Sequence, residues 1–269
     1  MSAPQSRPRP LVLKFGGAVL GEDGGLERAA ECVERERARH PGAGVVVVVS
    51  ALGMTTDRLF EEAVASAAAA VDGRPSGDPS MDPSGEDAGV ARYVRSGEED
   101  AARRMMAALE RVGAPAQLCS PECLGLVTSG TLLNGDPETL NAERLLGELY
   151  PAGEAPAVVV TMGYVAHDRS GRPSLLGRGG SDLTALFIAH HLGASDCVLL
   201  KNVDGIHEAD PHAPAGVGVP ARLDEVPFSE LEAFGGRVLQ AKAARFAVRH
   251  RLSFSLGSPD RPELRTRVR

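Results

Sequence analysis

The chain has 269 residues but no tryptophan, and aromatic residues make up only 4 % of it. A hydrophobic content of 43 % is still ordinary for a globular protein, so the core must be built from Ala, Val and Leu. No apolar run approaches the roughly 18 residues that a membrane span needs, and the polar segment 1–10 lacks the apolar region of a signal peptide. We therefore predict a cytoplasmic protein with no membrane segment, in which residues 1–10 are flexible and residues 11–269 form one domain.

Cysteine is scarce as well, with four residues at positions 32, 119, 123 and 197. None of them falls in a C-x-x-C pair, so the sequence suggests neither a disulfide framework nor a zinc ribbon. We expect free thiols in a reducing compartment. The excess of acidic over basic side chains gives a formal net charge of −7, which disfavours binding to nucleic acid or to an anionic membrane.

Two common fingerprints of nucleotide-binding proteins are also missing. There is no G-x-x-x-x-G-K-[ST] and no complete G-x-G-x-x-G, so neither a P-loop nor a Rossmann dinucleotide site is predicted. Two other glycine turns are present, KFGG at 14–17 after an apolar run and GRGGSD at 177–182 before a helical pattern. At the carboxyl ends of strands, such turns let backbone N–H groups approach phosphate oxygens. Either turn alone is more often structural than catalytic, so other motifs must decide between the two readings.

The order of apolar segments predicts an α/β fold. Strands are predicted at 11–13, 45–49, 117–118, 124–128, 157–161, 197–200 and 252–256, and helices at 26–40, 57–71, 97–112, 183–192 and 230–250. Five consecutive valines at 45–49 indicate a central parallel strand that is covered on both faces. The segment 72–89 is rich in Pro, Gly, Ser and Asp, which predicts a mobile surface loop. Together these patterns predict a three-layer αβα sandwich with a largely parallel central sheet and a small second lobe.

Five ordered motifs carry a resemblance to a known family. They are KFGG at 14–17, SALGMTTD at 50–57, SGE at 96–98, LGRGGSD at 176–182, and VDGI at 203–206 with ADP at 209–211. In order and approximate spacing they resemble the catalytic domains of aspartate kinases, which have the amino acid kinase fold. The likeness runs from about Leu11 to the end of the chain and includes FGGRVL at 234–239. It implies an ATP- and Mg²⁺-dependent kinase that acts on a small amino acid and forms a homodimer. It also implies a substrate side at roughly 90–165 and a nucleotide side at 166–269.

The resemblance assigns the catalytic roles to Lys14 and Asp182. Lys14 matches the family lysine that spans donor and acceptor, where an ammonium would neutralise charge on the transferring phosphoryl group. Asp182 matches the carboxylate that orients Lys14 or the metal-bound nucleotide. Gly16 and Gly17 would supply backbone donors to the phosphates.

The same resemblance implies a clamp for a free amino acid. Arg178 matches the arginine that pairs with the α-carboxylate, a task suited to a planar two-donor group. Glu98 matches the carboxylate that receives the α-ammonium, and Thr56 and Ser181 match hydroxyls of the acceptor pocket. Ser181 and Asp182 also have a simpler explanation as residues that cap the N-terminus of the following helix, and both roles can hold together.

The nucleotide is expected to lie on residues 201–205, KNVDG, which resemble a family loop that usually reads TDVDG. The ATP-binding residues implied in this way are Lys14, Gly16, Gly17, Gly179, Gly180, Lys201, Asn202, Asp204, Gly205, His207, His212 and Arg237. No metal ligand is assigned.

Several positions depart from the family pattern. Ala18 follows the first glycine turn where Thr or Ser is usual, Glu99 stands in place of an arginine, and Arg237 stands where Lys is common. His207 and His212 replace the usual Tyr and Arg beside the nucleotide loop. The lysine, glutamate, arginine and aspartate of the predicted site are all kept, which favours an active enzyme over a regulatory subunit that has lost turnover.

The function implied by the resemblance is attack of the aspartate side-chain carboxylate on the γ-phosphorus of ATP, giving 4-phospho-L-aspartate. Another acid of similar chemistry, such as glutamate or N-acetylglutamate, stays open as acceptor, although Arg178 and Glu98 favour a free α-amino acid. Aspartate kinases usually carry C-terminal ACT modules that bind end products, and the sequence has none after the kinase-like part. We therefore expect an enzyme without feedback control of this type.

Overall fold

The computed structural model describes residues 7–53, 58–65, 83–208, 221–232, 234 and 239–269. Within them, eight strands form one sheet in the order β12-β14-β13-β9-β1-β2-β6-β3. Their bounds are β1 Leu11–Phe15, β2 Val45–Val49, β3 Ala116–Leu118, β6 Val158–Met162, β9 Asp196–Leu200, β12 Glu225–Val226, β13 Phe254–Gly257 and β14 Thr266–Val268. Only the pairing of β13 with β14 is antiparallel, so the predicted α/β sandwich with a largely parallel sheet is confirmed.

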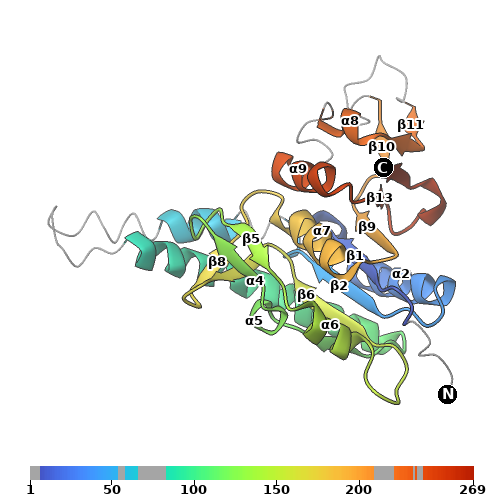
Figure 1. The fold of residues 1–269 in the computed structure, drawn as a ribbon, viewed down its shortest axis with the longest axis horizontal. Helices are drawn as coiled ribbons and strands as arrows, with labels where there is room; N and C mark the ends of the chain where they lie inside the picture. Colours follow the sequence, from blue (N-terminus) through green and yellow to red (C-terminus); the bar gives the residue numbers. More distant parts are fainter. Residues whose placement is uncertain (1–6, 54–57, 66–82, 209–220, 233, 235–238) are drawn as a thin grey trace, which may run out of the picture.

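Strand β2 explains why the sheet is covered on both faces. Its five valines are all fully buried, and they alternate between two separate cores. Val46 and Val48 pack with α7 (Gly180–Leu192) and α9 (Ala241–His250), while the other three valines pack with α2 (Gly25–Arg39) and α4 (Pro83–Arg111). Successive side chains of a strand point to opposite faces, so an unbroken apolar run requires a layer on each side. Figure 1 shows the sheet between these layers.

A second, smaller sheet has the order β5-β4-β7-β8 among the described residues. Its strands are β4 Val127–Ser129, β5 Asp136–Thr139, β7 Val165–Asp168 and β8 Pro173–Leu175. It packs on the N-terminal half of α4, where Val90, Ala91 and Val94 meet Val165 and Leu175 in a small core. This sheet is the small lobe that the sequence predicted. Its strands alternate along the chain with β6 of the large sheet, so the two sheets do not separate at a single residue.

The remaining elements are short. They are α1 Gly17–Leu20, a helical segment at 58–65, α5 Pro121–Leu124, α6 Ala142–Leu149, α8 Phe228–Leu231, the hairpin strands β10 Ile206–His207 and β11 Arg222–Leu223, and the 3-10 helix η2 Pro262–Leu264. The hairpin and α8 lie on the same side of the molecule as the C-terminus (Figure 1). No described helix combines the length and the apolar character that crossing a membrane requires.

Two predictions about the chain's organisation need correction. Helix α4 begins at Pro83, so residues 83–89 of the predicted loop are helical, and residues 72–82 lie outside the described residues. Residues 7–10 are held in place, since the Tyr150 hydroxyl donates to the Pro8 carbonyl at 2.6 Å and Arg9 Nε donates to the Gly193 carbonyl at 2.5 Å. Both contacts anchor the start of β1, and the first six residues lie outside the described part.

Two element boundaries also differ from the prediction. Residues 124–128 were expected as one strand, but Leu124 ends helix α5 and β4 starts only at Val127. Ser120 caps that helix by accepting the N–H of Cys123 at 3.2 Å, and a proline at the first position favours a helical turn. The segment 230–250, expected to be mainly helical, contains the end of α8 and, from Ala241, α9. All four cysteines are free thiols.

Candidate active site

The site forms where β1 and β9 end side by side. The register of this parallel pair places Phe15 opposite Leu200, so Lys14 and Lys201 come from neighbouring strand ends. Helix α7 begins at Gly180 and carries Asp182 in its first turn. Because ligands of open α/β sheets bind at the carboxyl ends of the strands, this edge is the expected place for a site.

Asp182 joins the two lysines. One carboxylate oxygen lies 2.7 Å from Lys14 Nζ and the other lies 2.9 Å from Lys201 Nζ. The side chains of Lys14 and Asp182 are 8 % and 6 % exposed, while that of Lys201 is 23 % exposed and opens toward solvent. One carboxylate therefore holds two ammonium groups next to each other, although like charges repel.

The electrostatics of this cluster keep Asp182 ionised. Burial alone would raise the pKa of its carboxyl group, but the ammonium groups of Lys14 and Lys201 outweigh burial and hold that pKa well below its usual range. Burial lowers the pKa of Lys14, and the charge of Asp182 opposes that effect. The net charge of the three groups is +1, which suits an anionic ligand at the open side of the cluster.

The cluster lies in a cleft of about 1730 Å³, which exceeds the usual volume of a pocket for one small ligand. The predicted site residues that line this cleft are Lys14, Gly17, Glu98, Arg178, Gly179, Gly180, Ser181, Asp182 and Lys201. The structure therefore brings together residues from both glycine turns, from the middle of α4 and from the end of β9. The volume is sufficient for a nucleotide and an acceptor together.

Glu98 and Arg178 have opposite environments within the cleft. Glu98 is fully buried in α4, and its Oε2 accepts the N–H of Ala51 at 2.8 Å. Arg178 is exposed, and within the described residues it has no hydrogen bond or ion pair to a protein group. A fixed carboxylate and an unengaged guanidinium in one cleft form a suitable pair of contacts for a zwitterion.

The turn that carries Arg178 depends on glycine. Gly177 and Gly179 have φ of +76° and +73°, in the left-handed region that favours glycine. A Cβ on Gly177 would lie 2.1 Å from Asn134 Oδ1, and a Cβ on Gly179 would lie 2.4 Å from the side chain of Gln240. The turn is therefore defined both by its backbone conformation and by close contacts on two sides.

Two predicted backbone donors are already used within the protein. The N–H of Gly16 donates to the Leu200 carbonyl at 3.0 Å, and the N–H of Gly180 donates to the Gly177 carbonyl at 2.9 Å. The expectation that Gly16 donates to phosphate is therefore wrong for this structure, because sheet pairing between β1 and β9 continues to that residue. Gly17 does line the cleft, and a Cβ there would lie 2.3 Å from the Ala51 carbonyl.

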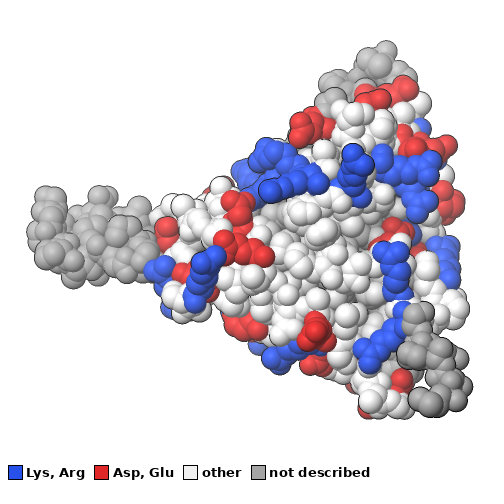
Figure 2. All heavy atoms as spheres, in the orientation of Figure 1, with Lys and Arg blue, Asp and Glu red and all other residues white. Residues whose placement is uncertain are grey.

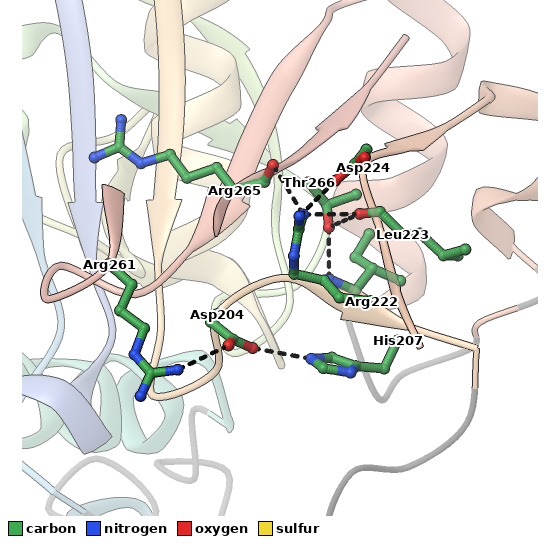
Figure 3. Close-up of polar contacts among 9 residues, drawn as sticks. Asp204, His207, Arg222, Leu223, Asp224, Arg261, Arg265 and Thr266 are labelled. Carbon is green, nitrogen blue, oxygen red and sulfur yellow. Dashed lines mark hydrogen bonds and ion pairs between the residues drawn. The ribbon is translucent and has the colours of Figure 1, made fainter. Parts of the chain in front are cut away.

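The predicted nucleotide loop divides into two parts. Lys201 lines the cleft, whereas Asp204 and His207 belong to a separate polar network that Figure 3 shows. His207 Nε2 lies 2.9 Å from Asp204 Oδ1, and Arg261 lies 3.5 Å from the other oxygen. The contact with His207 holds the pKa of Asp204 below its usual value.

The neighbouring residues connect this network to the C-terminal strand β14. Gly205 lies against Thr266, whose hydroxyl accepts the Ile206 N–H at 2.8 Å, and Asn202 is exposed. The network ties the loop to the C-terminal strand and leaves Asn202, Asp204, Gly205 and His207 outside the lining of the cleft. The predicted residues Thr56, His212 and Arg237 lie outside the described part of the chain.

Several residues that line the cleft were not predicted, among them Asn134, Asp136, Tyr164, Gln240 and Lys242. The pair Asn134-Gly135 was predicted only as a turn, which gave its conformation and not its neighbours. Lys242 lies in a helix with several basic residues, so its spacing gave no signal. Tyr164 has φ of +69°, which is uncommon for a residue other than glycine.

The described residues do not assemble a cage for a divalent cation, since they contain no group of three His, Cys, Asp or Glu side chains that could hold one. Each oxygen of Asp182 has an ammonium group as its partner. Mg²⁺ prefers several oxygen ligands, and substrate phosphates often provide some of them. The described part of the chain therefore offers no preformed protein site for a divalent cation.

Comparison of the sequence with known proteins identifies a family and relatives that are kinases. The model of the amino acid kinase family matches residues 9–253. An aspartate kinase of Pseudomonas fluorescens (strain SBW25) is 30 % identical over 240 residues, which cover 88 % of this chain and 53 % of that protein. An aspartokinase of Mycobacterium tuberculosis (strain H37Rv) is 31 % identical over 258 residues, covering 94 % of this chain and 56 % of that protein. The chain thus spans about half the length of the curated relatives it matches.

Solved structures share the fold. Escherichia coli aspartokinase III, in complex with lysine and aspartate, gives a TM-score of 0.72 at 23 % identity and covers 97 % of this chain and 64 % of its own. An isopentenyl phosphate kinase gives a TM-score of 0.64 at 16 % identity, with 96 % and 99 % covered. The largely parallel sheet with a polar cleft at its carboxyl edge places the protein among the α/β folds that bind ligands at the strand ends. The chain belongs to the amino acid kinase family.

Proposed function

We propose that this chain transfers the γ-phosphoryl group of ATP to the side-chain carboxylate of L-aspartate, giving 4-phospho-L-aspartate and ADP. The proposal is carried by one observation, the pair of ammonium groups that Asp182 holds in the same cleft as Glu98 and Arg178. The aspartate kinases among the relatives support it, as does a structural neighbour in complex with aspartate and ADP.

The reaction needs neutralisation of charge more than it needs a proton acceptor. An oxygen of the acceptor carboxylate forms a bond to the γ-phosphorus while the bond to the β,γ-bridging oxygen breaks, and ADP leaves with that electron pair. The carboxylate is already an anion at neutral pH, so no general base is required. Repulsion between two anions is the main obstacle, and Lys14 and Lys201 lie where they can offset it. Mg²⁺ would enter on the phosphates of ATP.

The other end of the cleft would hold the amino acid. Arg178 pairs with the α-carboxylate, and Glu98 receives the α-ammonium, so an acid with a blocked amino group would lose one of these contacts. Thr56 and Ser181 are proposed hydroxyl contacts to the acceptor, and Ser181 lines the cleft. We further propose that Lys201 contacts the phosphates of the nucleotide, and that the nucleotide is also bound by Asn202, Asp204, Gly205, His207, His212 and Arg237.

The test uses hydroxylamine, which traps an acyl phosphate as a hydroxamate. Purified protein is incubated with Mg-ATP, hydroxylamine and, separately, L-aspartate, L-glutamate, N-acetyl-L-aspartate and N-acetyl-L-glutamate. We expect hydroxamate with L-aspartate and none with its N-acetylated form. Hydroxamate with another acid would support the same phosphoryl transfer but show that the acceptor is not L-aspartate. Absence of product with all four acids, in protein that binds ATP, would overturn the proposal in favour of a role without turnover.

The proposal extends to two properties of the whole molecule. We propose a homodimer, to be measured by sedimentation equilibrium, and a cytoplasmic location, to be measured by fractionation of cells that express the protein. A monomer at concentrations at which the enzyme is active would contradict the first.

A further inference from the structure

Lys242, near the start of α9, has five oxygen atoms of described residues around its ammonium nitrogen. It donates to the carbonyl oxygens of Gly135 at 2.7 Å, Leu176 at 3.1 Å and Asn134 at 3.4 Å, and to Asn134 Oδ1 at 3.0 Å. Asp136 Oδ1 lies 3.1 Å away. A lysine ammonium has only three N–H donors, so these acceptors share them. Most of the acceptors are carbonyl groups, which makes this a contact to backbone and not an ordinary surface ion pair.

The oxygens belong to two segments that both line the cleft. Residues 134–136 form the turn that leads into β5 of the small sheet. Leu176 directly precedes the glycine turn 177–180, which carries Arg178. Lys242 therefore ties α9, on the large sheet, to a turn of the small sheet and to the turn of the predicted acceptor clamp.

Contacts between the two segments extend this tie to Arg178. The N–H of Gly135 donates to the Leu175 carbonyl at 2.8 Å, so the two segments are also paired directly. The side chain of Asn134, whose Oδ1 Lys242 holds, fills the space where Gly177 has no Cβ. Gln240, two residues before Lys242, packs in the same way on Gly179. Contacts from Asn134 and from the start of α9 thus support the glycine turn on two sides.

Other basic residues of α9 have no such contacts. Arg245 and Arg249 also line the cleft, and Figure 2 shows lysine and arginine side chains gathered over this part of the molecule. Neither arginine has a hydrogen bond or ion pair to a described residue. The contacts of Lys242 are therefore specific to its position and do not follow from the basic character of the helix.

We propose that Lys242 is a positioning residue, which sets the geometry of the Arg178 turn for the α-carboxylate of the acceptor. The proposal rests on the function proposed above and names a residue that acts through Asn134 and Leu176 and does not touch substrate. Its removal is expected to weaken use of the amino acid much more than use of ATP, because none of the oxygens around Lys242 belongs to the phosphate-end cluster of Lys14, Lys201 and Asp182. Misplacement of a binding group by about 1 Å can cost about 10²-fold.

The test compares Lys242→Met with the control Arg251→Met, at an exposed residue that directly follows the same helix and does not line the cleft. We expect Lys242→Met to raise the KM for L-aspartate about tenfold or more, with the KM for ATP within about threefold of the parent value. Arg251→Met should leave both constants near the parent values. Asn134→Ala should resemble Lys242→Met, and the double variant should lose less than the product of the two single effects, since both act through one contact.

The possible outcomes separate this proposal from the proposed function. If the parent protein gives no hydroxamate with any acid, the proposed function fails, and this inference fails with it. If the parent is active and Lys242→Met keeps the parent KM for L-aspartate, only the positioning role is overturned. Equal increases in both KM values, with a lower melting temperature, would also overturn it, because they would indicate a role in folding alone. Thermal unfolding of each variant is therefore recorded with the kinetics.

Discussion

Lys14 Nζ lies 2.7 Å from a carboxylate oxygen of Asp182, and both side chains are almost fully buried. Lys201 occupies the other oxygen of the same carboxylate at 2.9 Å. The two ammonium groups stay close to each other because the carboxylate of Asp182 lies between them. Loss of Asp182 is therefore expected to lower both the activity and the stability of the protein.

We expect Asp182→Asn to lower the rate of hydroxamate formation by about 10²-fold or more, because the ammonium groups lose the group that orients them. The free energy of unfolding should fall by about 3 kcal/mol, since a buried lysine is left without its partner. Rates in the trapping assay and urea unfolding measure the two effects. Activity within threefold of the parent would remove Asp182 from the mechanism.

For Arg178, unlike Asp182, we expect an effect on substrate binding with almost no effect on stability. Its side chain is exposed and makes no polar contact with the described residues, so Arg178→Ala should change the free energy of unfolding by less than about 0.5 kcal/mol. The KM for L-aspartate should rise by about tenfold or more, because a two-donor contact to a carboxylate is lost. Arg103→Ala, an exposed residue on α4, is the control for a change of net charge. An unchanged KM would show that another residue binds the α-carboxylate.

The effect of the close contact at Gly177 can be separated from the effect of its backbone angle by comparison with Gly171, which has a similar φ. Gly177 and Gly171 have φ of +76° and +82°, but a Cβ would meet Asn134 at 2.1 Å in the first case and nothing within 4 Å in the second. Gly171→Ala should cost about 1 kcal/mol of stability from backbone strain alone. Gly177→Ala should cost about 1–3 kcal/mol more, because Asn134 must move. Similar losses in chemical denaturation would mean that the contact with Asn134 is easily rearranged.

The pair Arg95–Glu122, which joins α4 to α5, predicts a dependence of stability on pH. Partial burial would raise the pKa of Glu122, but the hydrogen bonds from Arg95 and Ser120 lower it from 4.5 to about 2. Because the folded pKa is the lower one, the stabilisation is complete above about pH 4.5 and is lost as the pH falls toward 2.

Glu122→Gln should therefore be less stable than the parent at pH 7, by no more than about 1 kcal/mol because the pair is half-exposed. The difference should shrink between pH 4.5 and about 2, the window set by the two pKa values. Unfolding by urea at a series of pH values measures this. A difference that stays constant down to pH 2 would assign the loss to packing and not to charge.

The sequence predicted those features that depend on local pattern. The valines of β2 predicted a strand covered on both faces, and alternation of helices and strands predicted the parallel sheet. The motif residues Lys14, Glu98, Arg178 and Asp182 were predicted from resemblance, and the structure places all four in one cleft.

The rest depends on contacts between distant segments. The N–H of Gly16 is unavailable because β9 lies beside β1, and no pattern within the glycine turn reveals that pairing. Lys242 donates a hydrogen bond to Gly135, which lies 107 residues earlier in the chain. The sequence pattern of α9 does not predict this contact. The start of α4 at Pro83 was missed because a Pro- and Ser-rich composition outweighed the helical pattern that follows.

The two ends of the cleft lie on different elements of the fold. This arrangement has a consequence for how acceptor specificity could differ between relatives. Lys14, Lys201 and Asp182 lie on β1, beside the end of β9, and on α7, whose backbones the large sheet and its cores fix. The Arg178 turn is supported by Asn134 and Lys242, outside those cores. Under the proposed function, substitutions in the turn at 134–136 would alter the acceptor end of the cleft and leave the phosphate end intact, so one scaffold could serve kinases that differ only in the acceptor they use.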